Sequence, residues 1–216
     1  MKKKIAVLGS MLATAFAMST PAIAGVVFEN GNNPQQKPEE NILFNGPGTN
    51  TTGPTVIGRT NQSNVLVSFQ SNEALIASAN GQADLKAADG GFKLLDIYLT
   101  DGGTFGDLIF NLKAGVGDSG VALVTVNLLG GGTQTYDLGV DNGQNFLTIY
   151  ATDTDRITSV NINSDTDVTA VEITDGKQFR ISEVQGTSVP VPEPGTLALL
   201  GVGLLGIQRL RRKYHN

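Results

Sequence analysis

The feature that most constrains the fold is a series of short apolar runs between residues 64 and 184. Each run is rich in Val, Ile, Thr, Phe and Tyr, and clusters of Gly, Asn and Asp separate the runs at spacings near ten residues. Such runs are typical of strands, and no helical pattern lies between them to suggest a parallel sheet. The runs read NVLVSFQ, ALIAS, FKLLDIYL, DLIFNLKA, VALVTVNLL, TQTYDLG, NFLTIYA, ITSVNIN, VTAVEIT and QFRISEV. The sequence therefore predicts an all-β protein.

Several of these runs alternate between apolar and polar residues. Val124 and Val126, for example, alternate with Thr125 and Asn127. Alternation of this kind indicates antiparallel strands with one buried face and one solvated face. We therefore expect a single antiparallel β-sandwich domain, jelly-roll-like, over residues 25–188.

Turn signals separate the predicted strands. Asn80-Gly81 and Asp175-Gly176 lie between apolar runs, where both dipeptides favour type I′ hairpins. The segment LGGGT at residues 129–133 predicts another tight connection.

Residues 25 to 64 are rich in Gly, Asn, Pro, Thr and Gln, with three short apolar islands at Val26–Phe28, Ile42–Phe44 and Val56–Ile57. The segment is either a flexible linker or a set of edge strands joined by long loops. The islands favour packed edge strands.

The N-terminus has the pattern of a secretory signal. Three lysines precede an apolar run, and Ala22-Ile23-Ala24 then gives the small-x-small cleavage pattern before Gly25. We expect a signal helix at residues 1–24, recognised by the secretion machinery and cut by signal peptidase after Ala24. An uncleaved membrane anchor is the alternative, although the apolar run is short for a span of about 20 residues.

The C-terminal residues 189–213 combine three features in a fixed order. A Pro-Glu-Pro triplet comes first, and an uncharged apolar run from Gly195 to Gln208 follows. A helix over that run would be roughly 21 Å long, short for a hydrocarbon core of about 30 Å. The basic end predicts a cytoplasmic stop, and it consists of Arg209, Arg211, Arg212 and Lys213. We expect a short transmembrane helix with the domain outside.

This tail resembles the sorting signal of PEP-CTERM proteins. The signature residues stand at Val191, Pro192, Glu193 and Pro194, while Gly195 occupies a position that is often Ser in the family. The resemblance implies that exosortase, a membrane protease-transferase of Gram-negative bacteria that make extracellular polysaccharide, recognises the tail. It also implies transient anchoring in the inner membrane, followed by display at the cell surface or in the extracellular matrix.

Charge and composition exclude several functions. Between Glu29 and Glu193 the chain has 20 acidic and eight basic residues, a net charge of about −12. Nucleic acids and anionic membrane surfaces require clustered Lys or Arg, so we expect neither as a partner of the body. The chain has no Cys, and its single histidine is His215 in the tail. A Ser-His-Asp or Cys-His centre and a His-ligated metal site therefore cannot form in the body, and we expect no enzyme.

Carboxylates remain as candidate ligands for calcium, which prefers six to eight oxygen atoms. Pairs of acids on predicted loops offer such oxygens, although none matches the twelve-residue calcium loop. The candidates are Asp101, Asp107, Asp153, Asp155, Asp165 and Asp167. Solvated turn residues are the favoured interpretation of these acids, so we predict no metal site and no cofactor, with calcium as the alternative.

Tyr98, Tyr136 and Tyr150 would form a sugar-stacking face if they shared one sheet surface, but burial in strands is the favoured interpretation. The predicted function is an exported, non-catalytic surface or matrix protein associated with extracellular polysaccharide. The alternatives are a glycan-binding module assisted by calcium and, as a minority view, a glycosidase that uses two carboxylates.

Overall fold

The structure, a computed structural model, describes residues 25–34, 39–79, 83–165 and 170–186. These residues contain twelve β-strands and no α-helix. The strands are β1 (Val26–Asn30), β2 (Glu40–Leu43), β3 (Thr52–Thr60), β4 (Leu66–Ala77), β5 (Asp84–Ala87), β6 (Leu94–Leu99), β7 (Asp107–Ala114), β8 (Ser119–Leu128), β9 (Thr133–Asp141), β10 (Asn145–Ala151), β11 (Ile157–Asn163) and β12 (Ile173–Ser182). The all-β prediction is confirmed.

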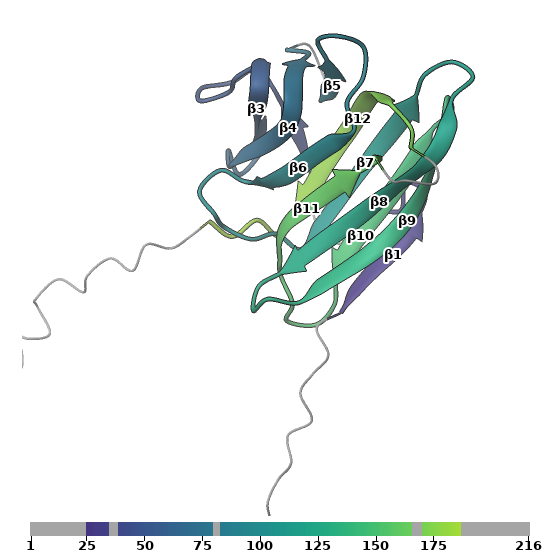
Figure 1. The fold of residues 1–216 in the computed structure, drawn as a ribbon. Coiled ribbons are helices and arrows are strands. Elements are labelled where there is room, and N and C mark those ends of the chain that lie inside the picture. Colours follow the sequence, from purple (N-terminus) through teal and green to yellow (C-terminus); the bar gives the residue numbers. More distant parts are fainter. Residues whose placement is uncertain (1–24, 35–38, 80–82, 166–169, 187–216) are drawn as a thin grey trace, which may run out of the picture.

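Hydrogen bonds connect the strands into one antiparallel sheet, in the order β1-β10-β7-β12-β2-β3-β4-β6-β11-β8-β9. The additional strand β5 pairs with both β4 and β12, so that β12, β2, β3, β4 and β5 form a closed ring. In Figure 1 the ring strands β3, β4 and β5 lie at the upper left, and the long strands β8, β9 and β10 lie at the lower right. The described strands are therefore joined in one continuous sheet, whereas the expected sandwich has two separate sheets.

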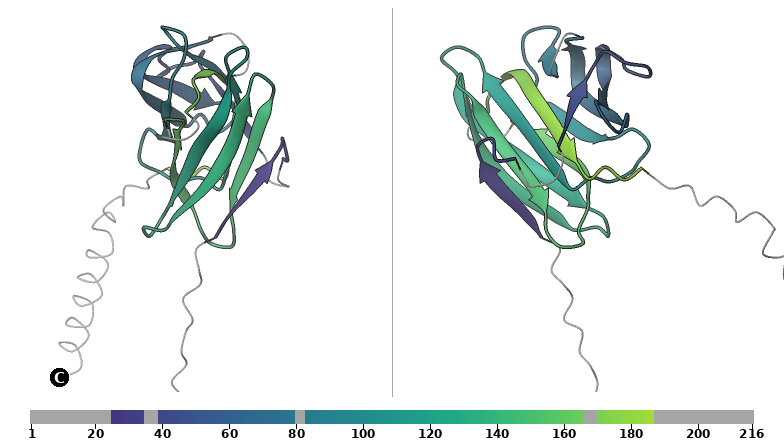
Figure 2. Two further views of the ribbon diagram at one scale, coloured as in Figure 1. Left: turned by 45° about the vertical axis from the view of Figure 1, so that its right-hand side comes forward. Right: turned by 180° about the vertical axis from the view of Figure 1, so that it is seen from behind.

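Phenylalanines connect the ring to the long strands. Phe179 of β12 lies edge-on to Phe69 of β4, with ring centroids 4.8 Å apart, and it stacks on Phe110 of β7 at 6.2 Å. Phe44 extends the cluster, since its ring is 5.6 Å from that of Phe69. All four side chains are buried, and each aromatic of this kind removes roughly 150–250 Å² from water. The turned views in Figure 2 show the same strands from two further sides.

The apolar runs of the sequence correspond closely to strands. Three runs match β7, β10 and β11 residue for residue, and the runs NVLVSFQ and ALIAS merge into the single long strand β4. The alternation in β8 is confirmed, because Val124 and Val126 are buried while Thr125 and Asn127 are half-buried. The three N-terminal islands form strands as favoured, although only β1 lies at an edge of the sheet.

The hairpin predicted at Asp175-Gly176 is wrong, because both residues lie within β12. Gly176 pairs with Leu112 of β7 on one side and with Leu85 of β5 on the other. Register shifts on either side of it, between Ile173 and Asp175 and between Lys177 and Arg180, accommodate the extra residues as bulges. Hydrogen-bonded pairing of β12 with β5 and with β7 thus outweighs the local preference of Asp175-Gly176 for a turn.

The other turn signals have different outcomes. The tight connection at 129–133 is confirmed: it joins β8 to β9, with Gly130 and Gly131 at φ of 98° and 94°. Asn80-Gly81 lies outside the described residues, although β4 and β5 on its two sides pair antiparallel. The short strand β5 was not predicted from the sequence.

The signal helix and the C-terminal helix also fall outside the described residues. Within the described ranges, no helix is long and apolar enough to cross a membrane.

Candidate functional site

Both ends of the described domain are fastened to the same group of loops. Gly25 accepts a hydrogen bond from the N–H of Thr152 at 3.0 Å, and the adjacent Ala151 donates to the carbonyl of Gly106 at 2.9 Å. Two residues earlier in that loop, Thr104 exchanges two backbone hydrogen bonds of 2.7 Å with Gln185. We call this region the exit end: Gly25, residues 100–107, residues 152–156 and residues 182–186. In Figure 1 the purple β1 begins and the yellow-green β12 ends in the lower half of the molecule.

The last described residues are held by close backbone packing. A Cβ at Gly103 would lie 2.2 Å from the carbonyl oxygen of Gln185 and 2.8 Å from the Cα of Gly186. The contact therefore requires glycine, because real Cβ atoms do not approach backbone atoms so closely. The carboxylate of Asp101 accepts a hydrogen bond from the N–H of Gly103 at 2.9 Å, which fixes the loop beneath Gly186.

Two further polar contacts anchor β12 where it ends. The hydroxyl of Ser182 donates to Oδ2 of Asp107 at 2.5 Å, and both side chains are buried. Arg156 donates to Oε2 of Glu183 at 2.8 Å, and this ion pair is about one quarter exposed. A carboxylate taken out of water must be hydrogen-bonded or paired to be tolerated, so these contacts stabilise one position of the strand.

The calcium candidates are separated rather than gathered. Asp101 and Asp107 make the contacts just described, and Asp155 accepts a hydrogen bond from the backbone N–H of Gly25 at 2.5 Å. Asp165 lies elsewhere, 3.2 Å from the ammonium of Lys93, and Asp167 is outside the described residues. Within the described part of the chain, no three acidic or other metal-ligating side chains are placed to hold an ion.

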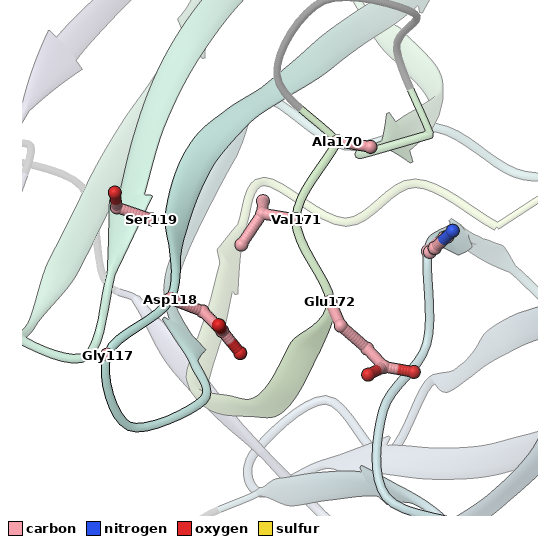
Figure 3. A pocket seen from close by; sticks show the side chains of 7 residues that line it. Gly117, Asp118, Ser119, Ala170, Val171 and Glu172 are labelled. Carbon is pink, nitrogen blue, oxygen red and sulfur yellow. The ribbon is translucent and has the colours of Figure 1, made fainter.

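The opposite side of the fold, where β7 ends and where β6 and β12 begin, has a different character. A depression of about 450 Å³ lies there, with polar lining from Lys93, Asp118, Ser119 and Glu172. Figure 3 shows the carboxyl groups of Asp118 and Glu172 on the two sides of this opening. We call this region the far end. It also includes Glu73, which interacts electrostatically with Glu172, and Asp89, which interacts with Glu73.

Carboxylates crowd one another at the far end. Burial raises the pKa of Glu73 above its ordinary value of 4.5, and the neighbouring Asp89 raises it further through its charge and a hydrogen bond. Glu172 adds to this effect, while the cation of Lys93 opposes it. Like charges at short range disfavour the ionised form, so the fold makes ionisation of Glu73 less favourable than it is in water.

The three tyrosines do not form one sugar-stacking face. Tyr136 stacks on Phe28 with ring centroids 5.1 Å apart, and the hydroxyl of Tyr150 donates to Glu29 at 3.0 Å. Because Phe28 and Glu29 are successive residues of β1, they point to opposite faces of the sheet. Tyr98 lies on β6, where its hydroxyl donates to Gln70.

The residues predicted for sorting and cleavage lie outside the described residues, with the exception of Gly25. They are Ala22, Ala24, Val191, Pro192, Glu193, Pro194, Arg209, Arg211, Arg212 and Lys213. The structure adds residues that the sequence did not single out, above all Gly103, Ser182 and Glu183. A GG dipeptide before a strand was the only available signal for Gly103, and the pair Gly130-Gly131 elsewhere in the chain has no such contact.

Fold and site thus define a β domain whose last strand is fastened a few residues before a tail of distinct composition. The PEP-CTERM protein-sorting motif matches that tail over residues 190–213. No curated protein and no solved structure matches the chain. The tail of the chain therefore carries a PEP-CTERM protein-sorting motif, and the motif implies exosortase as a processing partner, export, and a tail anchored in the membrane before processing.

Proposed function

We propose that this chain is an exported, non-catalytic surface or matrix protein that exosortase processes through its tail and that associates with extracellular polysaccharide. The observation that carries the proposal is the position of the sorting motif directly after the exit end. Gly186 and Pro192 are separated by five residues. An extended chain advances at most 3.3–3.6 Å per residue, so the triplet lies within about 20 Å of the domain.

This short tether has a mechanical consequence for sorting. When the triplet is bound by an enzyme in the membrane, the exit end must face that membrane. The contacts of Gly103, Ser182 and Glu183 then keep β12 folded while the tail is engaged. The two prolines restrict φ and oppose helix formation, so they favour an extended, accessible triplet outside the apolar run.

The absence of a catalytic role is part of the proposal. Histidine occurs only at position 215 and cysteine does not occur, so nucleophile–base chemistry in the body lacks its usual residues. We likewise propose that the domain works without a resident cofactor.

The test of the proposal is a triple substitution, Pro192→Ala, Glu193→Ala and Pro194→Ala, in a native host that contains exosortase. Alanine allows helix to extend through the triplet, and we expect the tail to be retained on an immunoblot specific for it. The matched control replaces Thr187, Ser188 and Val189 with alanine, which keeps the tether length, and it should be processed normally. Equal loss of the tail in the wild type and the triple variant would contradict the proposal.

A second candidate function is glycan binding, and the polar depression at the far end favours it. Lys93, Asp118, Ser119 and Glu172 offer donors and acceptors that suit sugar hydroxyls, although none of the described residues that line the opening is aromatic. A glycan array probed with and without a chelator tests both binding and the need for calcium. Binding that is lost on Glu172→Gln but retained on Asp137→Asn, on the exposed edge strand β9, would support this candidate.

A further inference from the structure

The backbone nitrogen of Gly25 is held directly against a carboxylate. It lies 2.5 Å from Oδ2 of Asp155, and the carbonyl of the same glycine accepts hydrogen bonds from the N–H and hydroxyl of Thr152. Asp155 is fixed in turn, because its own N–H donates to the carbonyl of Thr152 at 3.0 Å. The loop 152–156 is thus arranged around the first residue of the domain.

Gly25 is also the residue that signal cleavage would expose. Hydrolysis of the amide bond between Ala24 and Gly25 consumes one water molecule, leaves a carboxylate on Ala24 and leaves an ammonium group on Gly25. We propose that Asp155 is a binding site for this new ammonium group, so that export itself fastens β1 to the loop 152–156. The inference rests on the export step of the proposed function and not on the processing of the tail.

Cleavage changes the strength of the contact without requiring a new geometry. Before cleavage a neutral amide donates to the carboxylate, whereas afterwards both partners are charged. Cleavage therefore adds the attraction between two opposite unit charges to a hydrogen bond that already had one ionised partner. Gly25 and Asp155 are both half-buried, so salt screens the pair less than it screens an exposed one.

The position at β1 gives the contact a structural role. β1 is a terminal strand of the sheet and pairs with β10 alone. Its other described contacts include the stacking of Phe28 on Tyr136 and a 3.3 Å hydrogen bond from Val26 to Gln134 of β9. Terminal strands fray unless their first residues are held. An ionic contact at Gly25 therefore opposes fraying at the point where it begins.

The surrounding charges leave Asp155 as the partner in contact. Asp153 of the same loop is exposed, and Arg156 is engaged with Glu183. The neighbouring strand β9 presents the neutral amide of Gln134, and at the end of β10 the hydroxyl of Tyr150 binds Glu29 of β1. Among the described residues, the ammonium group therefore contacts the carboxylate of Asp155 and no cation.

The test compares two chains that both continue to Asn216 and are purified in the same mild detergent. One begins at Gly25 and the other at Ala24, so that in the second the charged amine is displaced by one residue. We expect the Gly25 chain to unfold at a temperature about 2–4 °C higher, a shift typical of one such contact in a domain of this size. Asp155→Asn should abolish the difference, and Asp153→Asn, the matched control in the same loop, should preserve it. Equal unfolding temperatures for the two starts, or a difference that survives Asp155→Asn, would overturn the proposal.

A second measurement keeps the test decisive if Asp155→Asn does not fold. The pKa of a free α-amino group is about 7.7–8.0, and a carboxylate partner raises it. The added stability is full below that ordinary range and is lost as pH rises through the raised pKa. Acylation of the Gly25 amine, followed against pH, should therefore show a higher midpoint in the folded chain than in urea. Identical midpoints would contradict the proposal.

The premise is checked separately by N-terminal sequencing of the exported chain. A first residue other than Gly25 would overturn the inference. A host without exosortase tests only the tail, because the start at Gly25 does not depend on that enzyme.

Discussion

The carboxylates of the exit end and those of the far end have different kinds of neighbour. At the exit end Asp101 binds the N–H of Gly103, Asp155 binds the N–H of Gly25, and Glu183 binds Arg156. At the far end Glu73 lies against Asp89 and near Glu172, and the pKa of Glu73 is raised as a result. The exit end thus places each of these carboxylates against a donor, whereas the far end places carboxylates against one another.

The two ends of the sheet therefore differ in what they are expected to do: the exit end anchors the chain, and the far end does not. Specific polar contacts gather where the chain enters and leaves the domain, which is the region that a short sorting tether would load. The far end is polar and places Glu73 near two other carboxylates, so we expect it to contribute less to stability. Stability and sorting should therefore depend on the exit end, while changes at the far end should be tolerated.

The largest expected effect is that of Gly103→Ala. The new Cβ would lie 2.2 Å from the carbonyl oxygen of Gln185, so the last residues of the domain must move away. Overpacking of this kind costs up to about 3 kcal/mol of unfolding free energy. Urea unfolding measures the change.

Gly139→Ala on β9 is the control, since a Cβ there meets no atom within 4 Å. It should change the unfolding free energy by less than about 0.5 kcal/mol. Similar costs at both positions would remove the distinction between the exit end and the edge of the sheet.

The next effect compares the ion pair of Arg156 and Glu183 at the exit end with the exposed pair that Asp165 forms with Lys93. Glu183→Gln leaves Arg156 half-buried without its carboxylate, and we expect a loss of about 1 kcal/mol in unfolding free energy. Asp165→Asn breaks the pair with Lys93, whose two side chains are 41% and 63% exposed. Surface pairs of that kind contribute about 0–1 kcal/mol, and here the loss should fall at the low end of the range. The comparison fails if Asp165→Asn proves the costlier change.

The smallest effect has the opposite sign and depends on pH. Because the folded state raises the pKa of Glu73, stability falls as pH rises from about 4.5 through that raised pKa. Glu73→Gln removes the penalty, so the variant should have a slightly higher urea midpoint than the wild type at pH 7. The gain should vanish near pH 4, where Glu73 is protonated in both states.

Asp137→Asn is the control for this change, because it removes one carboxylate from an exposed position on β9 without relieving the far-end cluster. It should leave the midpoint almost unchanged. A loss of stability on Glu73→Gln at pH 7 would show that the far end is stabilised by its charges.

Much of the strand content was predictable because it depends on local pattern. The runs at 107–114, 145–151 and 157–163 match β7, β10 and β11, since short runs of β-branched, aromatic and other apolar residues specify a strand wherever it pairs. Asp175-Gly176 shows the limit of local reasoning. Its turn preference was overridden by ladders to β5 and β7, and pairing partners so distant in sequence leave no local signal.

The sorting residues of the tail could be predicted from the sequence, whereas the anchoring residues of the β domain could not. Pro192, Glu193 and Pro194 form a contiguous motif that could be read from the sequence alone, and they lie within residues 190–213, which the PEP-CTERM protein-sorting motif matches. Gly103 and Glu183 act through contacts with Gln185 and Arg156, which only the folded chain brings together. Asp101, Asp107 and Asp155 were noticed as oxygen donors, and the fold gives each a different partner.

Sorting through the tail is tested by the intact mass of the protein from its native host, with and without exosortase. With the enzyme, we expect a chain that begins at Gly25 and lacks the basic end from Arg209 to Asn216. Without the enzyme, the chain should still begin at Gly25 and keep every residue to Asn216. An identical mass in the two hosts would contradict the conclusion that this domain is delivered through its sorting tail.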